Sequence, residues 1–186
     1  MFFPFYADLP FIILIPAILL AAYAQIKVQT TFNRYSKVPA RSGITGAEAA
    51  RHLLRSNNIY DISVELTKGT LTDHYDPRNK VLRLSPEVYN SSSLSALGVA
   101  AHEVGHVLQH QLGYIPFNLR TAIVPLANIG SQLSFPLLLA GLFLGLPSLV
   151  EIGVLAFSLA VLFQLVTLPV EFNASHRAVA ALKGYG

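Results

Sequence analysis

Cysteine is absent from this sequence of 186 residues. The absence excludes disulfide bonds, thiolate zinc sites, cysteine-held iron–sulfur clusters and a cysteine nucleophile. Any metal ion that the protein binds must therefore be held by histidine and carboxylate side chains. No repeat period is visible either, which excludes collagen and repeat arrays.

Charged residues are also scarce, at 12% of the sequence, whereas hydrophobic residues make up 53%. A soluble domain usually carries about a quarter charged residues, so a fully water-exposed protein is not expected. The formal net charge is +3. In the segment 27–120 both signs are interspersed, which is typical of juxtamembrane charge plus an ordinary surface rather than of a nucleic-acid partner.

The first uncharged block lies between Asp8 and Lys27 and is 18 residues long. At 1.5 Å per residue a helix of this length just crosses a bilayer core of about 30 Å. A cleaved signal peptide would carry basic residues before such a block, but here they follow it: Lys27, Arg34, Lys37 and Arg41. The positive-inside rule therefore predicts an uncleaved anchor with its N-terminus outside the cell.

The second block lies between Arg120 and Glu171, where Glu151 is the only charged residue. It is too long for one span, so we expect a transmembrane hairpin with spans near 121–144 and 152–170 and a turn at 145–148. The alternative is a buried helix pair in a soluble protein, but the remaining residues are too few to cover such a pair. The flanking basic residues place both ends of the hairpin in the cytoplasm: Arg120, Arg177 and Lys183.

The segment between the two blocks has the pattern of a small α+β domain. Thr45 to Glu48 forms a capping box, which predicts a helix to about Ser56. A serine near 91–93 begins a largely apolar helix that ends near Gln111. Three β-rich runs predict a small antiparallel sheet: 62–66, 69–72 and 80–84.

The apolar helix contains His102-Glu103-Val104-Gly105-His106, an H-E-x-x-H sequence. Residues four apart share one face of a helix, so both imidazoles can bind one metal ion. Glu103 lies about 100° round the helix, where it can reach a water on that ion without being a ligand. The alternative is a helix with incidental histidines, but three titratable groups inside an apolar helix are costly without a partner. A zinc ion would supply that partner.

A catalytic zinc site needs a third protein ligand and an open position for water. His110 continues the same helical stripe and lies about 12 Å from His102, too far to share the ion. Glu171 lies where the hairpin returns to the membrane face, so topology can bring it beside both histidines. From topology alone, a zinc ligand and an interfacial charge are equally good interpretations of Glu171. The candidates together are His74, His110, His176, Asp73, Asp76 and Glu171.

Three stretches, GTLTDHYDPRNKVLRLS, HEVGH and LPVEFNASHRA, make the chain resemble the YugP-like family of bacterial membrane zinc metallopeptidases. More distantly, it resembles the HtpX and CaaX-prenyl-protease group, which has a ligand glutamate in an E-x-x-A-D motif. Glu171 and Ala174 match that motif, but Ser175 stands where the group has Asp. The resemblance implies a gluzincin site with Glu171 as third zinc ligand. The family usually continues into a further C-terminal span, which suggests that this chain is truncated.

These observations predict a membrane α+β fold, with a zincin-like metallopeptidase core and about three transmembrane helices. The core combines the H-E-x-x-H helix with the small antiparallel sheet. The chain divides into a membrane anchor, a cytoplasmic zincin-like segment, a transmembrane hairpin and the start of a helix with the third ligand: 1–26, 27–120, 121–170 and 171–186.

We expect a zinc-dependent peptidase in which Glu103 is the general base for a zinc-activated water. Its metal ligands are His102, His106 and Glu171. The active site should lie at the cytoplasmic face, close to lipid, which favours peptides or membrane proteins as substrates. Residues 70–75 suit an edge strand that pairs with the substrate backbone. Three further residues are candidates for the oxyanion donor or for substrate contacts: His74, His176 and Arg177.

Two other classes of protein compete with this interpretation. One is an inactive membrane scaffold with a structural zinc, whose site would be closed by four protein ligands. The other is a transporter, which predicts ionisable residues inside the spans. Only Glu151 qualifies, and it lies near the outer end. The polar residues of the spans are better explained by helix packing: Asn128, Ser131, Gln132 and Gln164. The sequence does not specify an oligomeric state.

Overall fold

The computed structural model describes the backbone of residues 9–183 and the side chains from Ile15 onward. The start of the predicted anchor, 1–8, and the end of the chain, 184–186, lie outside the described residues. The described part of the chain is mostly helical, with one small three-stranded sheet. In chain order the elements are α1 (Leu9–Tyr35), α2 (Gly46–Ser56), β1 (Ser63–Leu66), β2 (His74–Asp76), β3 (Val81–Leu84), α3 (Pro86–Tyr89), α4 (Leu94–Gln111), α5 (Ile115–Leu144) and α6 (Pro147–Lys183).

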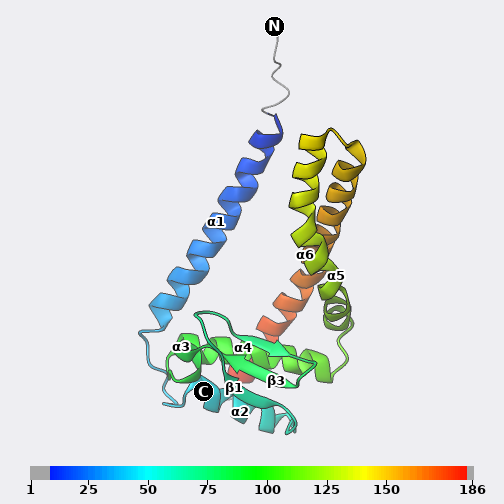
Figure 1. Ribbon diagram of the computed structural model, residues 1–186. Helices are drawn as coiled ribbons and strands as arrows, with labels where there is room; N and C mark the ends of the chain where they lie inside the picture. Colours follow the sequence, from blue (N-terminus) through cyan, green and yellow to red (C-terminus); the bar gives the residue numbers. More distant parts are fainter. Residues whose placement is uncertain (1–8, 184–186) are drawn as a thin grey trace.

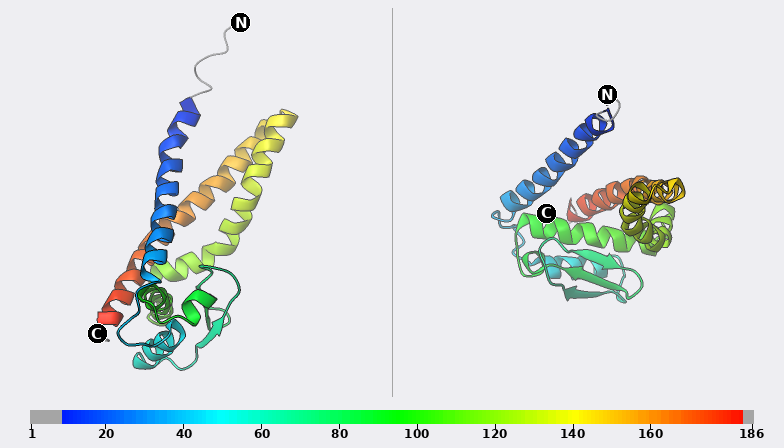
Figure 2. Two further views of the ribbon diagram at one scale, coloured as in Figure 1. Left: turned by 90° about the vertical axis from the view of Figure 1, so that its left-hand side faces the viewer. Right: turned by 45° about the horizontal axis from the view of Figure 1, so that its top comes forward.

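The long helices α1, α5 and α6 extend from the same side of a smaller body that contains α2, α3, α4 and the sheet (Figure 1). Helix α4 crosses this body, and the last turns of α6 return beside it (Figures 1 and 2). The hydrophobic core lies around α4, where Ala96, Ala100, Val104 and Val107 are almost completely buried. The helix that carries H-E-x-x-H is therefore the central element of the fold.

The two predicted helix starts are confirmed by their caps. Thr45 Oγ1 accepts a hydrogen bond from the Glu48 amide at 3.3 Å, and Glu48 Oε2 accepts one from the Thr45 amide at 2.8 Å. Ser93 Oγ accepts from the Ala96 amide at 3.2 Å and caps α4. These bonds satisfy amides that a helix start otherwise leaves without a partner.

The predicted antiparallel sheet is wrong in one respect, because the sheet is mixed. Strand β3 lies in the middle, with β2 antiparallel on one side and β1 parallel on the other. The run 69–72 is not a strand: Gly69 and Leu71 have φ values of 100° and 54°, which interrupt an extended chain. The loop 67–73 instead carries the chain past the end of β3, so that β2 becomes an edge strand.

The hairpin has the predicted turn but longer helices. Gly145 adopts the left-handed conformation, with φ 64°, and α6 begins at Pro147. Helix α5 begins at Ile115 rather than near 121, and α6 runs without a break through Pro169 to Lys183. Both helices are long and apolar enough to cross a membrane. Only 17% and 6% of their most apolar windows are buried within the protein, so they do not have the surroundings of soluble core helices.

Over its described residues, the predicted anchor helix α1 is not found to be long and apolar enough to cross a membrane. The third transmembrane helix therefore stays a prediction.

Helix α4 lies very close to α6 at Gly105. A Cβ atom added to Gly105 would lie 2.6 Å from the carbonyl oxygen of Ala174, which is closer than real Cβ contacts. Val170, Ala174 and Ala178 form the buried stripe of α6 on this side. The glycine thus permits the helix contact that positions the C-terminal part of α6.

Replacing Gly105 with alanine should destabilise the protein by about 1–3 kcal/mol, because one of two packed helices must move. The control is Gly98→Ala on the same helix, where the added Cβ meets nothing within 4 Å. We expect the thermal unfolding midpoint in detergent to fall for Gly105→Ala and not for Gly98→Ala. Equal midpoints for the two variants would refute the close contact.

Candidate metal centre

Three side chains from two helices converge at one point. His102 and His106 come from α4, and Glu171 comes from α6. Glu171 Oε2 lies 3.1 Å from His102 Nε2 and 3.5 Å from His106 Nε2. Among the described residues, these three form the one group of histidine, aspartate or glutamate side chains that can hold a metal ion, with ligand atoms within 4.8 Å of one another.

The position of His106 is set by the buried side chain of Gln109. His106 Nδ1 lies 3.0 Å from Gln109 Oε1. The amide nitrogen of Gln109 donates to the Val170 carbonyl oxygen at 2.8 Å and to Asn173 Oδ1 at 3.1 Å. Because both of these atoms are acceptors, the amide oxygen must face His106. His106 then donates its Nδ1 proton to Gln109, so Nε2, beside Glu171, is the nitrogen available to a metal ion.

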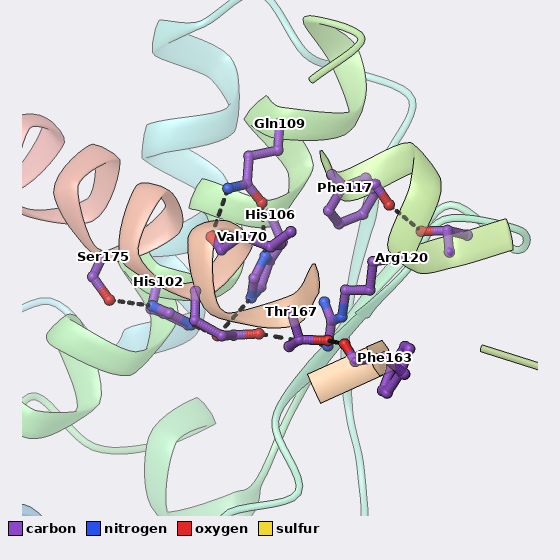
Figure 3. A network of polar contacts seen from close by, with 11 residues as sticks. His102, His106, Gln109, Phe117, Arg120, Phe163, Thr167, Val170 and Ser175 are labelled. Carbon is purple, nitrogen blue, oxygen red and sulfur yellow. Dashed lines mark hydrogen bonds and ion pairs between the residues drawn. The ribbon is translucent and has the colours of Figure 1, made fainter. Parts of the chain in front are cut away.

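His102 has a corresponding partner in Ser175, whose Oγ lies 3.2 Å from His102 Nδ1 (Figure 3). Ser175 is the residue that departs from the E-x-x-A-D motif. Its hydroxyl contacts the outer nitrogen of a candidate ligand histidine, a position at which a carboxylate can also bind. Both imidazoles therefore have Nδ1 partnered and Nε2 directed to the same place.

Glu103 is buried, with 8% of its surface exposed, and is not one of the three convergent residues. Burial raises the pKa of its carboxyl group above the ordinary value, although the nearby charges of His106 and His102 act in the opposite direction. Burial lowers the pKa of His106, but the hydrogen bond to Glu171 and the charge of Glu103 outweigh this and raise it. The electrostatics of the site are thus those of two carboxylates facing two imidazoles.

A cavity of about 640 Å³ opens onto these residues. Its walls come from β2 and the following turn, from α4, from the first turns of α5 and from α6. His102, Glu103, His106 and Glu171 all line it. The side chains near the convergence point are therefore accessible to a ligand of peptide size.

Two residues of α5 belong to this site, although no sequence pattern assigns either of them a role in it. The ring of Phe117 lies 6.0 Å from that of His106, and Arg120 Nη2 lies 3.5 Å from Glu171 Oε1. Both line the cavity. In the sequence, Arg120 is recognisable only as a charge that flanks the hairpin. Its neighbours become known only when the two ends of the hairpin are placed together.

The other candidate residues lie in different surroundings. His74 lines the cavity from the edge strand β2, with its Nδ1 2.8 Å from the Thr72 carbonyl oxygen. His176 and Arg177 are not among the residues that line the cavity, and Arg177 Nε donates to Asn173 Oδ1 at 2.7 Å. Their roles in oxyanion or substrate contact remain predictions.

The remaining candidate ligands have other partners. Asp73 accepts hydrogen bonds from the amide and hydroxyl of Ser85, and Asp76 accepts from Asn79 and Arg83. The hydrogen bonds from Asn79 lower the pKa of Asp76 to about 2, with Arg83 acting in the same direction. His110 Nδ1 lies 2.9 Å from the Tyr75 hydroxyl. None of these three is among the residues that converge on the candidate metal site.

The convergent residues fit a zinc ion. In a tetrahedral site with metal–ligand distances of about 2.0–2.1 Å, neighbouring ligand atoms lie about 3.3 Å apart. The two contacts of Glu171 Oε2, 3.1 and 3.5 Å, bracket this value. Imidazole nitrogen and carboxylate oxygen are the zinc ligands open to a protein without cysteine.

Comparison with known proteins assigns the chain to a protein family. The profile of a family described as "Putative neutral zinc metallopeptidase" matches residues 10–186, and the chain belongs to this family. The chain is also 54% identical to the "Putative membrane protease YugP" of Bacillus subtilis strain 168 over 164 residues, which cover 88% of this chain and 73% of the relative. No solved structure matches it significantly. The expected zinc cofactor and the resemblance to YugP are thereby confirmed.

Replacing Gln109 with leucine should weaken zinc binding by about 10–100-fold, because His106 loses the acceptor that fixes its tautomer. The matched control is Gln111→Leu, the same change at an exposed position of the same helix. Zinc affinity is measured by competition with a chelator on protein in detergent. Glu171→Ala serves as the reference for loss of a ligand. Equal affinities for the two leucine variants would contradict the role of Gln109.

Proposed function

We propose that the protein is a membrane-embedded zinc metallopeptidase that hydrolyses peptide bonds, with its active site at the cytoplasmic face of a bacterial cell membrane. The observation that carries the proposal is the convergence of His102 Nε2, His106 Nε2 and Glu171 Oε2 at the cavity. The partners of both Nδ1 atoms support it, because they leave the Nε2 atoms free to bind metal.

Glu103 is the proposed general base and general acid. Its carboxylate takes a proton from the attacking water and later delivers a proton to the leaving amine nitrogen. The raised pKa that burial gives to this carboxyl group favours the first of these transfers. When zinc is bound by His102, His106 and Glu171, it activates the water and polarises the substrate carbonyl group.

The alternative function is a catalytically inactive zinc-binding scaffold. A structural zinc site is closed by four protein ligands. In the part of the chain that the structure describes, the ligand group has three members, and they line an open cavity. Both observations favour catalysis over the scaffold.

The cavity also bears on the class of substrate. Beyond Arg120 its lining continues along α5 through Val124, Pro125 and Asn128, inside a candidate membrane span. Asn128, which the sequence suggests as a helix-packing residue, is instead exposed and faces this cavity. A site that extends from the edge strand into a membrane helix favours polypeptides cleaved next to the bilayer, including membrane proteins.

Replacing Glu103 with glutamine should abolish hydrolysis and leave zinc bound, because the amide cannot accept the proton and the ligands are unchanged. The probe is fluorescein-labelled, dephosphorylated β-casein, an unfolded protein, with purified enzyme in detergent. We expect cleavage by the native protein, no cleavage after chelation and recovery on adding zinc. Zinc is counted by elemental analysis. Activity of Glu103→Gln at the native level would reject this general base.

The proposed orientation places the hairpin turn outside the cell and the sheet-containing body in the cytoplasm. The absence of cysteine makes single-cysteine variants directly interpretable. In intact bacteria, a membrane-impermeant maleimide should label Ser148→Cys at the turn and not Ser42→Cys, which should react only after permeabilisation. Both positions are exposed. The reverse labelling pattern would overturn the orientation.

A further inference from the structure

Arg120 lacks the hydrogen bonds that the other partly buried arginines of the protein make. Arg51 donates to the Val64 carbonyl oxygen and the Tyr89 hydroxyl, and Arg83 donates to Asp76. Within the described residues, Arg120 has the Glu171 carboxylate 3.5 Å away as an ion pair, and its buried Nε has no partner. A guanidinium group carries five N–H donors, and unpaired donors in a partly buried position cost free energy.

The position of Arg120 indicates what these donors are for. The side chain is 29% exposed and lines the cavity beside Glu171. The same cavity is also lined by Asp76 and Arg78, from β2 and the turn after it, and by Val124 and Asn128, further along α5. A polypeptide that lies in the cavity can therefore contact Arg120.

The other cavity residues contribute few free donors near the metal ligands. The Nε2 atoms of His102 and His106 face Glu171, and Glu103 and Glu171 are acceptors. The Tyr75 hydroxyl is paired with His110, and burial, with the charges of Asp61 and Asp76, raises its pKa to about 12. Arg120 is thus the cation that stands closest to the ligand group with donors to spare.

We propose that Arg120 is a substrate-binding residue, whose terminal N–H groups donate to a backbone carbonyl oxygen of the polypeptide beside the scissile bond. The inference rests on the proposed peptidase function and adds the group that holds the substrate in register. A guanidinium suits this role because it stays charged and presents several donors in a fixed plane. The contact with Glu171 Oε1 holds the guanidinium over the cavity between substrates.

The test separates substrate binding from support of Glu171. Binding of the labelled β-casein is measured by fluorescence anisotropy in the Glu103→Gln background, with and without Arg120→Gln, and zinc affinity is measured on the same proteins. We expect casein binding to weaken by about 10-fold or more, as for a lost hydrogen bond to a charged group. Zinc affinity should change by less than about 3-fold. Arg55→Gln, on α2 outside the cavity, controls for the loss of one positive charge.

A second variant covers a failure of Arg120→Gln to fold. Arg120→Lys keeps a positive charge beside Glu171 but loses the planar set of donors, so it should show the same order of effects, weaker casein binding with unchanged zinc affinity. Native casein binding in both variants would overturn the proposal. So would a loss of zinc affinity as large as the loss of casein binding, since Arg120 would then act only on Glu171.

Product analysis distinguishes the two oxygen acceptors that an arginine can bind in a peptide. Internal casein fragments, identified by mass spectrometry, support a backbone carbonyl. Stepwise loss of residues from the C-terminus would assign the acceptor to the terminal carboxylate and overturn the proposal in this form. If the native protein binds casein in an Arg120-dependent manner but never cleaves it, the peptidase function fails while the binding role of Arg120 stands.

Discussion

The structure depends on the close contact between α4 and α6 at Gly105 and Ala174. Glu171 lies three residues before Ala174 on α6, and Ser175 follows it, so both lie beside the contact. His102 and His106 flank Gly105 on α4. The backbone approach at this point therefore determines that Glu171 Oε2 reaches both Nε2 atoms and that Ser175 reaches His102 Nδ1. A larger residue at position 105 would move all of these groups together.

The hairpin links this contact to the candidate membrane helices. Arg120 and Glu171 bound the long, nearly uncharged block of the sequence, and in the fold they lie 3.5 Å apart. Arg120 lies in the second turn of α5, and Glu171 lies on the part of α6 that packs against α4. Because α6 is continuous from the turn to Lys183, the candidate zinc ligand Glu171 lies on the same unbroken helix as a candidate membrane span.

Much of this arrangement follows from local sequence patterns. The capping residues Thr45 and Ser93, the turn at Gly145 and the spacing of His102 and His106 are short-range features, and short-range sterics and hydrogen bonding determine them. The mixed sheet could not be predicted, since the order of strands depends on where the loop 67–73 crosses. The role of Gln109 could not be predicted without the fold either, because two of its partners lie on α6, more than 60 residues away.

Arg120 bears on how Glu171 can bind a metal ion. The two oxygens of this carboxylate face different groups: Oε2 faces the imidazoles and Oε1 faces the guanidinium. An oxygen engaged by a cation is less available as a second metal ligand, so the arrangement favours binding through Oε2 alone. Two imidazole nitrogens and one carboxylate oxygen would leave the fourth position of a tetrahedral zinc site open. The charge of Arg120 would thus favour the open site that the proposed hydrolysis needs, rather than the closed site of a structural zinc.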